Sequence, residues 1–186
     1  MTAHGSLVWI DTETTGLDPE HDALLEVACI ITDADLNIVG TPVSCVIRPE
    51  SWEVLNRLDE DVWQMHWGSG LYDALPGGCP LAEAEAWIVA YVAENLDGRV
   101  PLAGSSVHFD RAVLRQNMPG LGFALTHRNV DVSTVKELAS RWAPDVFASR
   151  PTPTGNHRAL GDLHDSIAEL AHYRKHMAAF TPAAAS

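Results

Sequence analysis

Three short apolar runs open the chain, and polar turns separate them. The runs cover residues 6–11, 24–32 and 38–48, and the third is rich in β-branched side chains. The turn between the second and third runs reads Asp33-Ala-Asp-Leu-Asn. Strands joined by short turns favour an antiparallel meander, so this part of the chain is predicted to form three neighbouring strands of one sheet.

The rest of the chain alternates between helical and strand-like patterns. Apolar residues at helical spacing predict helices over 53–66, 81–95, about 108–117, 133 or 134 to about 144, and 157 or 158 to 176. Short strands are predicted at 100–104 and 130–131, and an irregular, proline-containing loop at 143–156. This order predicts an α/β fold in which helices flank a mixed five-stranded sheet.

Length and composition fit a single domain. The chain has 186 residues, of which 46% are hydrophobic, enough for an ordinary core. We expect one domain over residues 1–180 and a loose tail at 181–186. The sequence shows no membrane-spanning stretch and no signal peptide. Its three cysteines lack metal-site spacing, which favours reduced thiols in a cytoplasmic protein.

The charge is strongly acidic. Twelve Lys and Arg residues stand against 25 Asp and Glu residues, for a formal net charge of −13. Proteins that bind long nucleic acids need a basic surface to contact the phosphates. This chain has too few Lys and Arg residues to form a large basic surface. A polyanionic substrate is therefore expected to be short and to be neutralised by metal ions. Most of the acids are also explained by solubility alone.

Acidic side chains stand at the ends of predicted elements in three separate segments. Asp11 and Glu13 end the first strand, where residues i and i+2 point to the same face. Asp110 and Asp162 lie in the first turns of later helices. Four such carboxylates suit two divalent cations that promote hydrolysis of a phosphodiester. Each helical acid, taken singly, is better explained by the helix dipole, and it is the set of four that favours a metal site.

His157 lies close to the last of these acids in the sequence. A helix turns about 500° over the interval from His157 to Asp162, which leaves the two side chains about 140° apart. We therefore expect His157 at or before the first turn, at the end of the proline-rich loop. An imidazole there is suited to accept a proton from water. A surface histidine without a role is the alternative for this residue alone.

Together these residues resemble the DEDD 3′→5′ exonucleases that use a histidine base. Their pattern of Asp-x-Glu, Asp and His-x-x-x-x-Asp is met by Asp11, Glu13, Asp110, His157 and Asp162. Within that group the chain is most similar to the oligoribonuclease family. The similarity includes Val-Trp-Ile-Asp-x-Glu-x-Thr-Gly-Leu-Asp at 8–18, Met-His-x-x-Ser-Gly-Leu at 65–71 and Asp-Val-Ser-Thr-Val-Lys-Glu-Leu at 131–138, and it spans nearly the whole chain.

The resemblance implies a ribonuclease-H-like fold, a homodimer and removal of nucleotides from the 3′ ends of short RNA, down to dinucleotides. It implies that the four acids hold two Mg²⁺ or Mn²⁺ ions and that His157 is the general base. It also implies substrate contacts, which in the family come partly from the second protomer. The matching positions are Leu17, His66, Ser106, His127, Arg128, Ser133 and Thr134.

Several interpretations stay open. Leu17 is also explained as an ordinary turn residue, and Thr134 with Glu137 fits a capping box at a helix start. His127 replaces the family's tyrosine and offers less area for stacking. Two further functions are compatible with parts of the pattern. One is a DNA-directed exonuclease of the proofreading type, and the other is a non-catalytic nucleotide-binding module, which predicts a missing acid.

Overall fold

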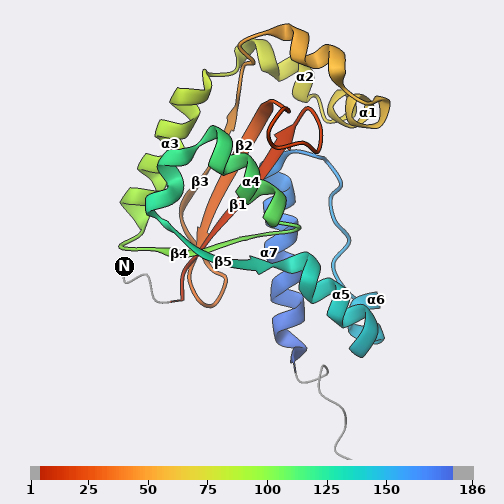
Figure 1. Cartoon of the computed structure of the whole chain (residues 1–186). Helices are drawn as coiled ribbons and strands as arrows, with labels where there is room; N and C mark the ends of the chain where they lie inside the picture. The colour runs from red at the N-terminus through yellow and green to blue at the C-terminus, as the bar shows by residue number, and fades with distance from the viewer. Residues whose placement is uncertain (1–4, 178–186) are drawn as a thin grey trace, which may run out of the picture.

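The structure is a computed structural model that describes residues 5–177, so the predicted tail at 181–186 lies outside the described residues. Within this range, five strands form one sheet in the order β3-β2-β1-β4-β5 (Figure 1). The strands are β1 (Leu7–Thr14), β2 (Leu24–Thr32), β3 (Ile38–Val46), β4 (Val100–Gly104) and β5 (Leu125–Asp131). The first three pair antiparallel, whereas β4 runs parallel to β1 and to β5. The predicted mixed sheet and meander are confirmed.

Alternation along β1 divides the core into two layers. Val8 and Ile10 pack in a cluster with residues of α3 (Leu81–Asn95) and α4 (His108–Asn117). Trp9 points the other way and packs against α7 (Ala159–Lys175), because successive strand residues face opposite sides of a sheet. Helices therefore cover both faces (Figure 1). The predicted bounds of α3 and α4 are confirmed.

The helix predicted over 53–66 is broken in the structure. A 3-10 helix, η1 (Trp52–Arg57), ends at Leu58, and α1 (Glu60–Gly68) begins after Asp59. Leu58 and Asp59 are both extended, with ψ angles of 134° and 151°, so the backbone cannot continue as a helix through them. Two short elements follow, α2 (Leu71–Ala74) and η2 (Leu75–Gly77).

The segment before α7 is also more ordered than the sequence suggested. The predicted loop at 143–156 contains α6 (Pro144–Ala148), in which proline opens the helix, where its missing N–H costs no hydrogen bond. Before it, η3 (Pro119–Phe123) leads into β5, and α5 (Val132–Trp142) follows directly. The capping box predicted at Thr134 is wrong, because the side chain of Asp131 accepts the hydrogen bond from the Ser133 amide at 2.9 Å.

Two smaller findings bear on the sequence predictions. Among residues 5–177, none of the helices combines the length and apolarity needed to cross a bilayer. Cys29, Cys45 and Cys79 are all free thiols, and the first two are buried. Burial raises the pKa of the Cys45 thiol to about 11, so this thiol stays protonated at neutral pH.

Candidate metal and catalytic site

The end of β1 places two carboxylates on the face that α7 covers. Asp11 and Glu13 follow Trp9 at alternate positions, and the α7 cluster lies on the Trp9 side. Asp162 lies in the first turn of α7. Ligand oxygens of Asp11, Glu13 and Asp162 all lie within 4.8 Å of one another. The structure therefore brings three of the four predicted acids into one group that could hold a metal ion.

Asp110, the fourth acid, approaches from the opposite side of β1. Thr12 points toward α4 because it alternates with Asp11 and Glu13. Its hydroxyl donates a hydrogen bond of 2.7 Å to Asp110 Oδ1. Asp110 is buried at the start of α4 and lines the same hollow, of about 490 Å³, as Asp11 and Glu13. We name this the acid hollow.

Burial and mutual repulsion oppose ionisation of the two strand acids. The pKa of Asp11 is raised well above its ordinary value, first by burial and then by the charges of Asp110 and Glu13. Burial, followed by the charge of Asp162, raises the pKa of Glu13 to about 8. Repulsion thus outweighs the one opposing positive charge, that of Arg158 on Glu13, and a bound cation would provide the counter-charge that both carboxylates need.

The two helical acids show the same effect with partial compensation. Burial raises the pKa of Asp110 to about 6, although the hydrogen bond from Thr12 opposes the shift. Burial also raises the pKa of Asp162, and the neighbouring charge of His157 opposes it. The set as a whole is an all-oxygen, electron-rich site, the donor type that hard divalent cations prefer.

An ion pair beside the acids, with a buried carboxylate and a partly exposed arginine, was not predicted from the sequence. Glu26 on β2 lies directly opposite Glu13 in the sheet register and is 2% exposed. Arg158 donates to both Glu26 oxygens, through Nε and Nη2, at 2.9 Å each. Glu26 stood out in the sequence as the acid in an apolar strand, but its partner is 132 positions away. The pair fastens the start of α7 to β2.

His157 lies immediately before this anchor. Its backbone has a φ angle of +47°, which a non-glycine residue adopts only when its surroundings hold it there. The side chain is exposed in a hollow between α1 and the proline-rich loop, which is also lined by Met65 and Ser69. The predicted position before the first turn of α7 is confirmed, and His157 is close enough to Asp162 to lower its pKa.

The acid hollow also collects two of the predicted substrate-contacting residues. Leu17 and Ser106 both line it. Leu17 is 84% exposed, and its loop is held by Asp22, which accepts hydrogen bonds of 2.8 Å from the Thr15 hydroxyl and from the Asp18 amide. An exposed apolar side chain on a held loop at the edge of the acid hollow is suited to pack against a base.

Two further predicted residues extend from Ser106 toward α5. The hydroxyl groups of Ser106 and Ser133 lie 3.2 Å apart. Ser106 has a φ angle of +56°, and its amide donates to the side chain of Asp131 at 3.0 Å. Thr134 follows Ser133 and is exposed. The hydroxyl groups of Ser106 and Ser133 therefore connect the acid hollow with the start of α5.

The remaining predicted contacts lie apart from the acid hollow. His66 on α1 is fully buried, with Nε2 2.9 Å from the Thr14 carbonyl oxygen and Nδ1 3.8 Å from Glu13 Oε2. It therefore lies behind Glu13. His127 and Arg128 are exposed on β5, the edge strand beyond β4.

Comparison with known proteins agrees with this geometry. The RNase_T family model, described as "Exonuclease", matches residues 8–170. An oligoribonuclease from Streptomyces griseus is 49% identical over 95% of this chain and 87% of its own length. This chain belongs to the oligoribonuclease family of exonucleases. Another member, from Tropheryma whipplei, is 44% identical over 91% of this chain and 92% of its own length. The family indicated by the motifs is thus confirmed.

Solved structures confirm the ribonuclease-H-like fold. A zinc-bound complex of Escherichia coli exonuclease I with single-stranded DNA has a TM-score of 0.73 at 18% identity and covers 95% of this chain. Exonuclease I from Methylocaldum szegediense has a TM-score of 0.64 at 23% identity over 94% of this chain. This chain spans only 42% of either structure.

Proposed function

We propose that this chain is a metal-dependent 3′→5′ exoribonuclease that degrades short oligoribonucleotides, down to dinucleotides, to mononucleotides. The convergence of Asp11, Glu13 and Asp162 carries the proposal, because their ligand oxygens lie within 4.8 Å of one another beside Asp110. The printed names of the family relatives supply the substrate class.

The four acids would hold two Mg²⁺ or Mn²⁺ ions. Their oxygen-only donor set and their raised pKa values fit hard divalent cations. Such ions supply, when bound, a water of lowered pKa and a counter-charge for the leaving oxygen. Asp11 and Glu13 reach the site from a strand and Asp110 and Asp162 from helices, so rigid elements hold all four carboxylates in place.

His157 is the proposed general base. Its exposed ring lies near Asp162 and can take the proton from the attacking water as the phosphodiester is cleaved. The next residue, Arg158, is held by a hydrogen bond of 2.9 Å from its Nε to the Glu26 carboxylate. The fully buried ring of His66 lies 3.8 Å behind the Glu13 carboxylate, and we assign it a supporting role for that ligand.

Substrate selection is assigned to groups around the acid hollow and to a second protomer. Leu17 packs against the bases at the 3′ end. We assign Ser106, Arg128, Ser133 and Thr134 to the 5′ phosphate and His127 to base stacking, acting across a homodimer. Charged and hydroxyl donors at the far end of a small site would exclude longer chains.

The proposal also covers the domain bounds, the cellular location and a protein interface. We propose a single exonuclease domain over residues 1–180 and a cytoplasmic location, for which the free thiols Cys29, Cys45 and Cys79 are the supporting observation. Trp63 and Trp67 stack at 5.1 Å between ring centroids and are 38% and 59% exposed. Exposed aromatic pairs of this kind suit a protein interface.

A labelled substrate series tests the proposal. RNA of two to seven nucleotides and single-stranded DNA of the same lengths, each with a 5′ label, are incubated with Mg²⁺ or Mn²⁺ and with a chelator. We expect stepwise loss from the 3′ end, fastest for dinucleotide RNA, and no reaction with the chelator. Faster cleavage of DNA would favour the proofreading-type enzyme. Absence of cleavage with either metal would favour the non-catalytic module.

A further inference from the structure

The edge strand β5 carries a bulge where it meets β4. Val100 lies opposite Leu125, but Leu102 lies opposite Asn129. Pro101 therefore faces the whole segment 126–128. Three residues of β5 face one residue of β4 here, so the regular ladder of backbone hydrogen bonds is interrupted, and carbonyl groups of this segment can accept hydrogen bonds from side-chain donors.

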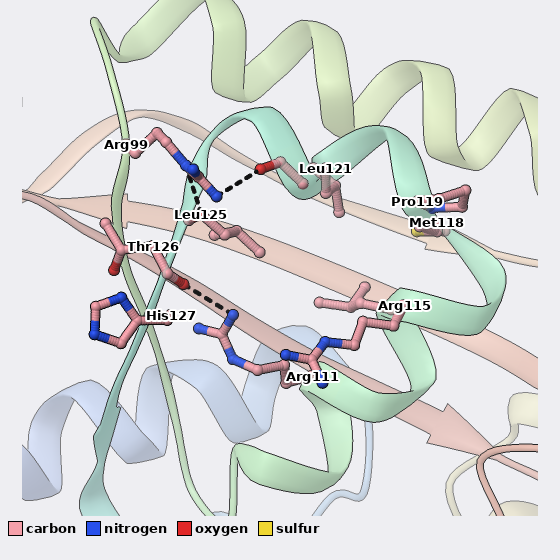
Figure 2. A pocket seen from close by; sticks show the side chains of 11 residues that line it. Arg99, Arg111, Arg115, Met118, Pro119, Leu121, Leu125, Thr126 and His127 are labelled. Atoms are coloured by element: carbon pink, nitrogen blue, oxygen red, sulfur yellow. Dashed lines mark hydrogen bonds between the residues drawn. The ribbon is translucent and has the colours of Figure 1, made fainter.

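Arginine side chains supply those donors. Arg111 on α4 donates through Nη1 to the Thr126 carbonyl at 2.9 Å and through Nη2 to the Arg128 carbonyl at 2.8 Å. Its Nε donates to the Asn129 side chain at 2.7 Å. All three nitrogen atoms of the Arg111 guanidinium therefore donate hydrogen bonds to residues of β5 along the bulge. Figure 2 shows Arg111 reaching from α4 toward Thr126, with His127 beside it.

A second arginine holds the strand just before the bulge. Arg99 donates to the Leu125 carbonyl at 2.8 Å and to the Gly122 carbonyl at 3.2 Å. Arg99, Arg111 and Arg115 all line one hollow of about 320 Å³ (Figure 2). The backbone bonds explain why Arg99 and Arg111 gather here in a chain whose net charge is −13.

The bulge contains two of the residues that we assign to substrate binding. His127 and Arg128 are exposed, and over residues 5–177 their side chains make no hydrogen bond or ion pair. Their backbone, in contrast, is fixed by Arg111 on either side of His127. The direction in which both side chains leave the strand is therefore set by Arg111.

We propose that Arg111 is a positioning residue, which holds the β5 bulge so that His127 and Arg128 meet the RNA in the correct orientation. The role rests on the proposed function, since it presumes that these two residues contact substrate. Arg111 directly follows Asp110, so one helix places both a metal-ligand candidate and the clamp on the bulge. Burial and the charge of Arg115 lower the pKa of Arg111, a cost that its bonds to β5 offset.

Arg115 is the matched control. It lies one turn further along α4 and lines the same hollow. In the part of the chain that the structure describes, its side chain makes no hydrogen bond and no ion pair. Arg115→Ala removes the same charge and a similar volume without touching the bulge. Arg111→Lys keeps the charge but cannot donate to three acceptors in one plane.

The test uses the full chain with two substrates. One is a 5′-phosphorylated RNA dinucleotide, and the other is the p-nitrophenyl ester of thymidine 5′-monophosphate, which has no second nucleotide to contact the bulge. For Arg111→Ala we expect KM for the dinucleotide to rise about tenfold, the effect of losing one well-placed contact, with kcat nearly unchanged. Hydrolysis of the ester should match the unaltered chain. Arg111→Lys should behave like Arg111→Ala, and Arg115→Ala like the unaltered chain.

Hydrogen exchange of the β5 amides provides a readout that does not depend on catalysis. Exchange over 125–131 should be faster in Arg111→Ala and Arg111→Lys than in Arg115→Ala. The proposal is overturned if KM for the dinucleotide is unchanged in Arg111→Ala, if both substrates are lost equally, or if lysine restores full activity. If the unaltered chain fails to cleave the dinucleotide with either metal, the proposed function fails instead. The exchange data then still decide whether Arg111 holds the bulge.

Discussion

Arg158 and Glu26 join the loop that carries His157 to the strand next to the acids. Their two hydrogen bonds, each 2.9 Å long, connect a guanidinium and a carboxylate in the bidentate geometry that favours strong pairing. Glu26 is buried opposite Glu13, and Arg158 also opposes the rise in the pKa of Glu13. The pair therefore holds the proposed base in place, and Arg158 partly offsets the charge of Glu26, which itself raises the pKa of Glu13.

Replacing Arg158 by methionine should lower both stability and activity. Glu26 would remain buried without its partner, which costs about 3 kcal/mol in comparable pairs. Urea unfolding measures this loss. The control is Arg141→Met, because the Arg141–Glu137 pair is exposed on both sides, and such pairs contribute only about 0.5 kcal/mol or less. Equal effects of the two substitutions would contradict an anchoring role for Arg158.

The sequence predicted the central sheet and the acid cluster well, for physical reasons. The strands β1 to β3 and the helices α3 and α4 carry uninterrupted patterns with clear breakers, so local information was sufficient. Strand alternation placed Asp11 and Glu13 side by side, and the helical angle placed His157 before α7. In each case a short segment determined the geometry.

Features that depend on distant contacts were missed. The extended pair Leu58 and Asp59 divides a helix that has an unbroken apolar pattern. Arg158 pairs with Glu26 across the fold, and Arg111 on α4 binds the bulge of β5. Such contacts follow only once the chain has folded, because no local pattern encodes the partner.

Asp11→Asn should abolish hydrolysis while leaving the fold intact. The substitution replaces a charged carboxylate by a neutral amide in the group that Asp11 forms with Glu13 and Asp162. It also removes repulsion among buried carboxylates, so the metal-free variant should unfold at a higher temperature than the unaltered chain. Glu94→Gln, at an exposed acid of α3, should change neither property. Normal hydrolysis by Asp11→Asn would remove Asp11 from the ligand set.

His157→Ala should lower kcat by roughly 10²–10⁴-fold, the usual contribution of a general base. Metal binding should be little changed, since the four acids are untouched, and metal titration followed by thermal unfolding measures this. His164→Ala is the control, because His164 is exposed further along α7. If His164→Ala and His157→Ala lose the same activity, another group is the base.

Leu17→Ala should weaken binding of short RNA without affecting stability. The side chain is 84% exposed, so its removal costs no core packing, whereas loss of an apolar contact with a base raises KM by about 5- to 10-fold. Ile38→Ala serves as the control, because Ile38 is 42% exposed on β3. Steady-state kinetics on dinucleotide RNA, measured for both variants, show whether KM rises in Leu17→Ala and not in Ile38→Ala. An unchanged KM for Leu17→Ala would favour its interpretation as an ordinary turn residue.

Stability without metal should fall as the pH rises, and divalent cations should reverse the fall. The pKa of Glu13 is raised from 4.5 to about 8 in the folded chain. Between these values the folded state retains a proton that the unfolded state has lost, so this contribution to stability is full below the lower pKa and disappears as the pH passes the upper one. Mn²⁺ binds the ionised carboxylates, so the increase in Tm that it produces over a chelator control should be larger at about pH 8.5 than at about pH 6. Glu13→Gln should make the metal-free profile less steep in this range, because one of the carboxyl groups with a raised pKa is gone. A Tm increase that is independent of pH in the unaltered chain would mean that the cations bind away from Glu13.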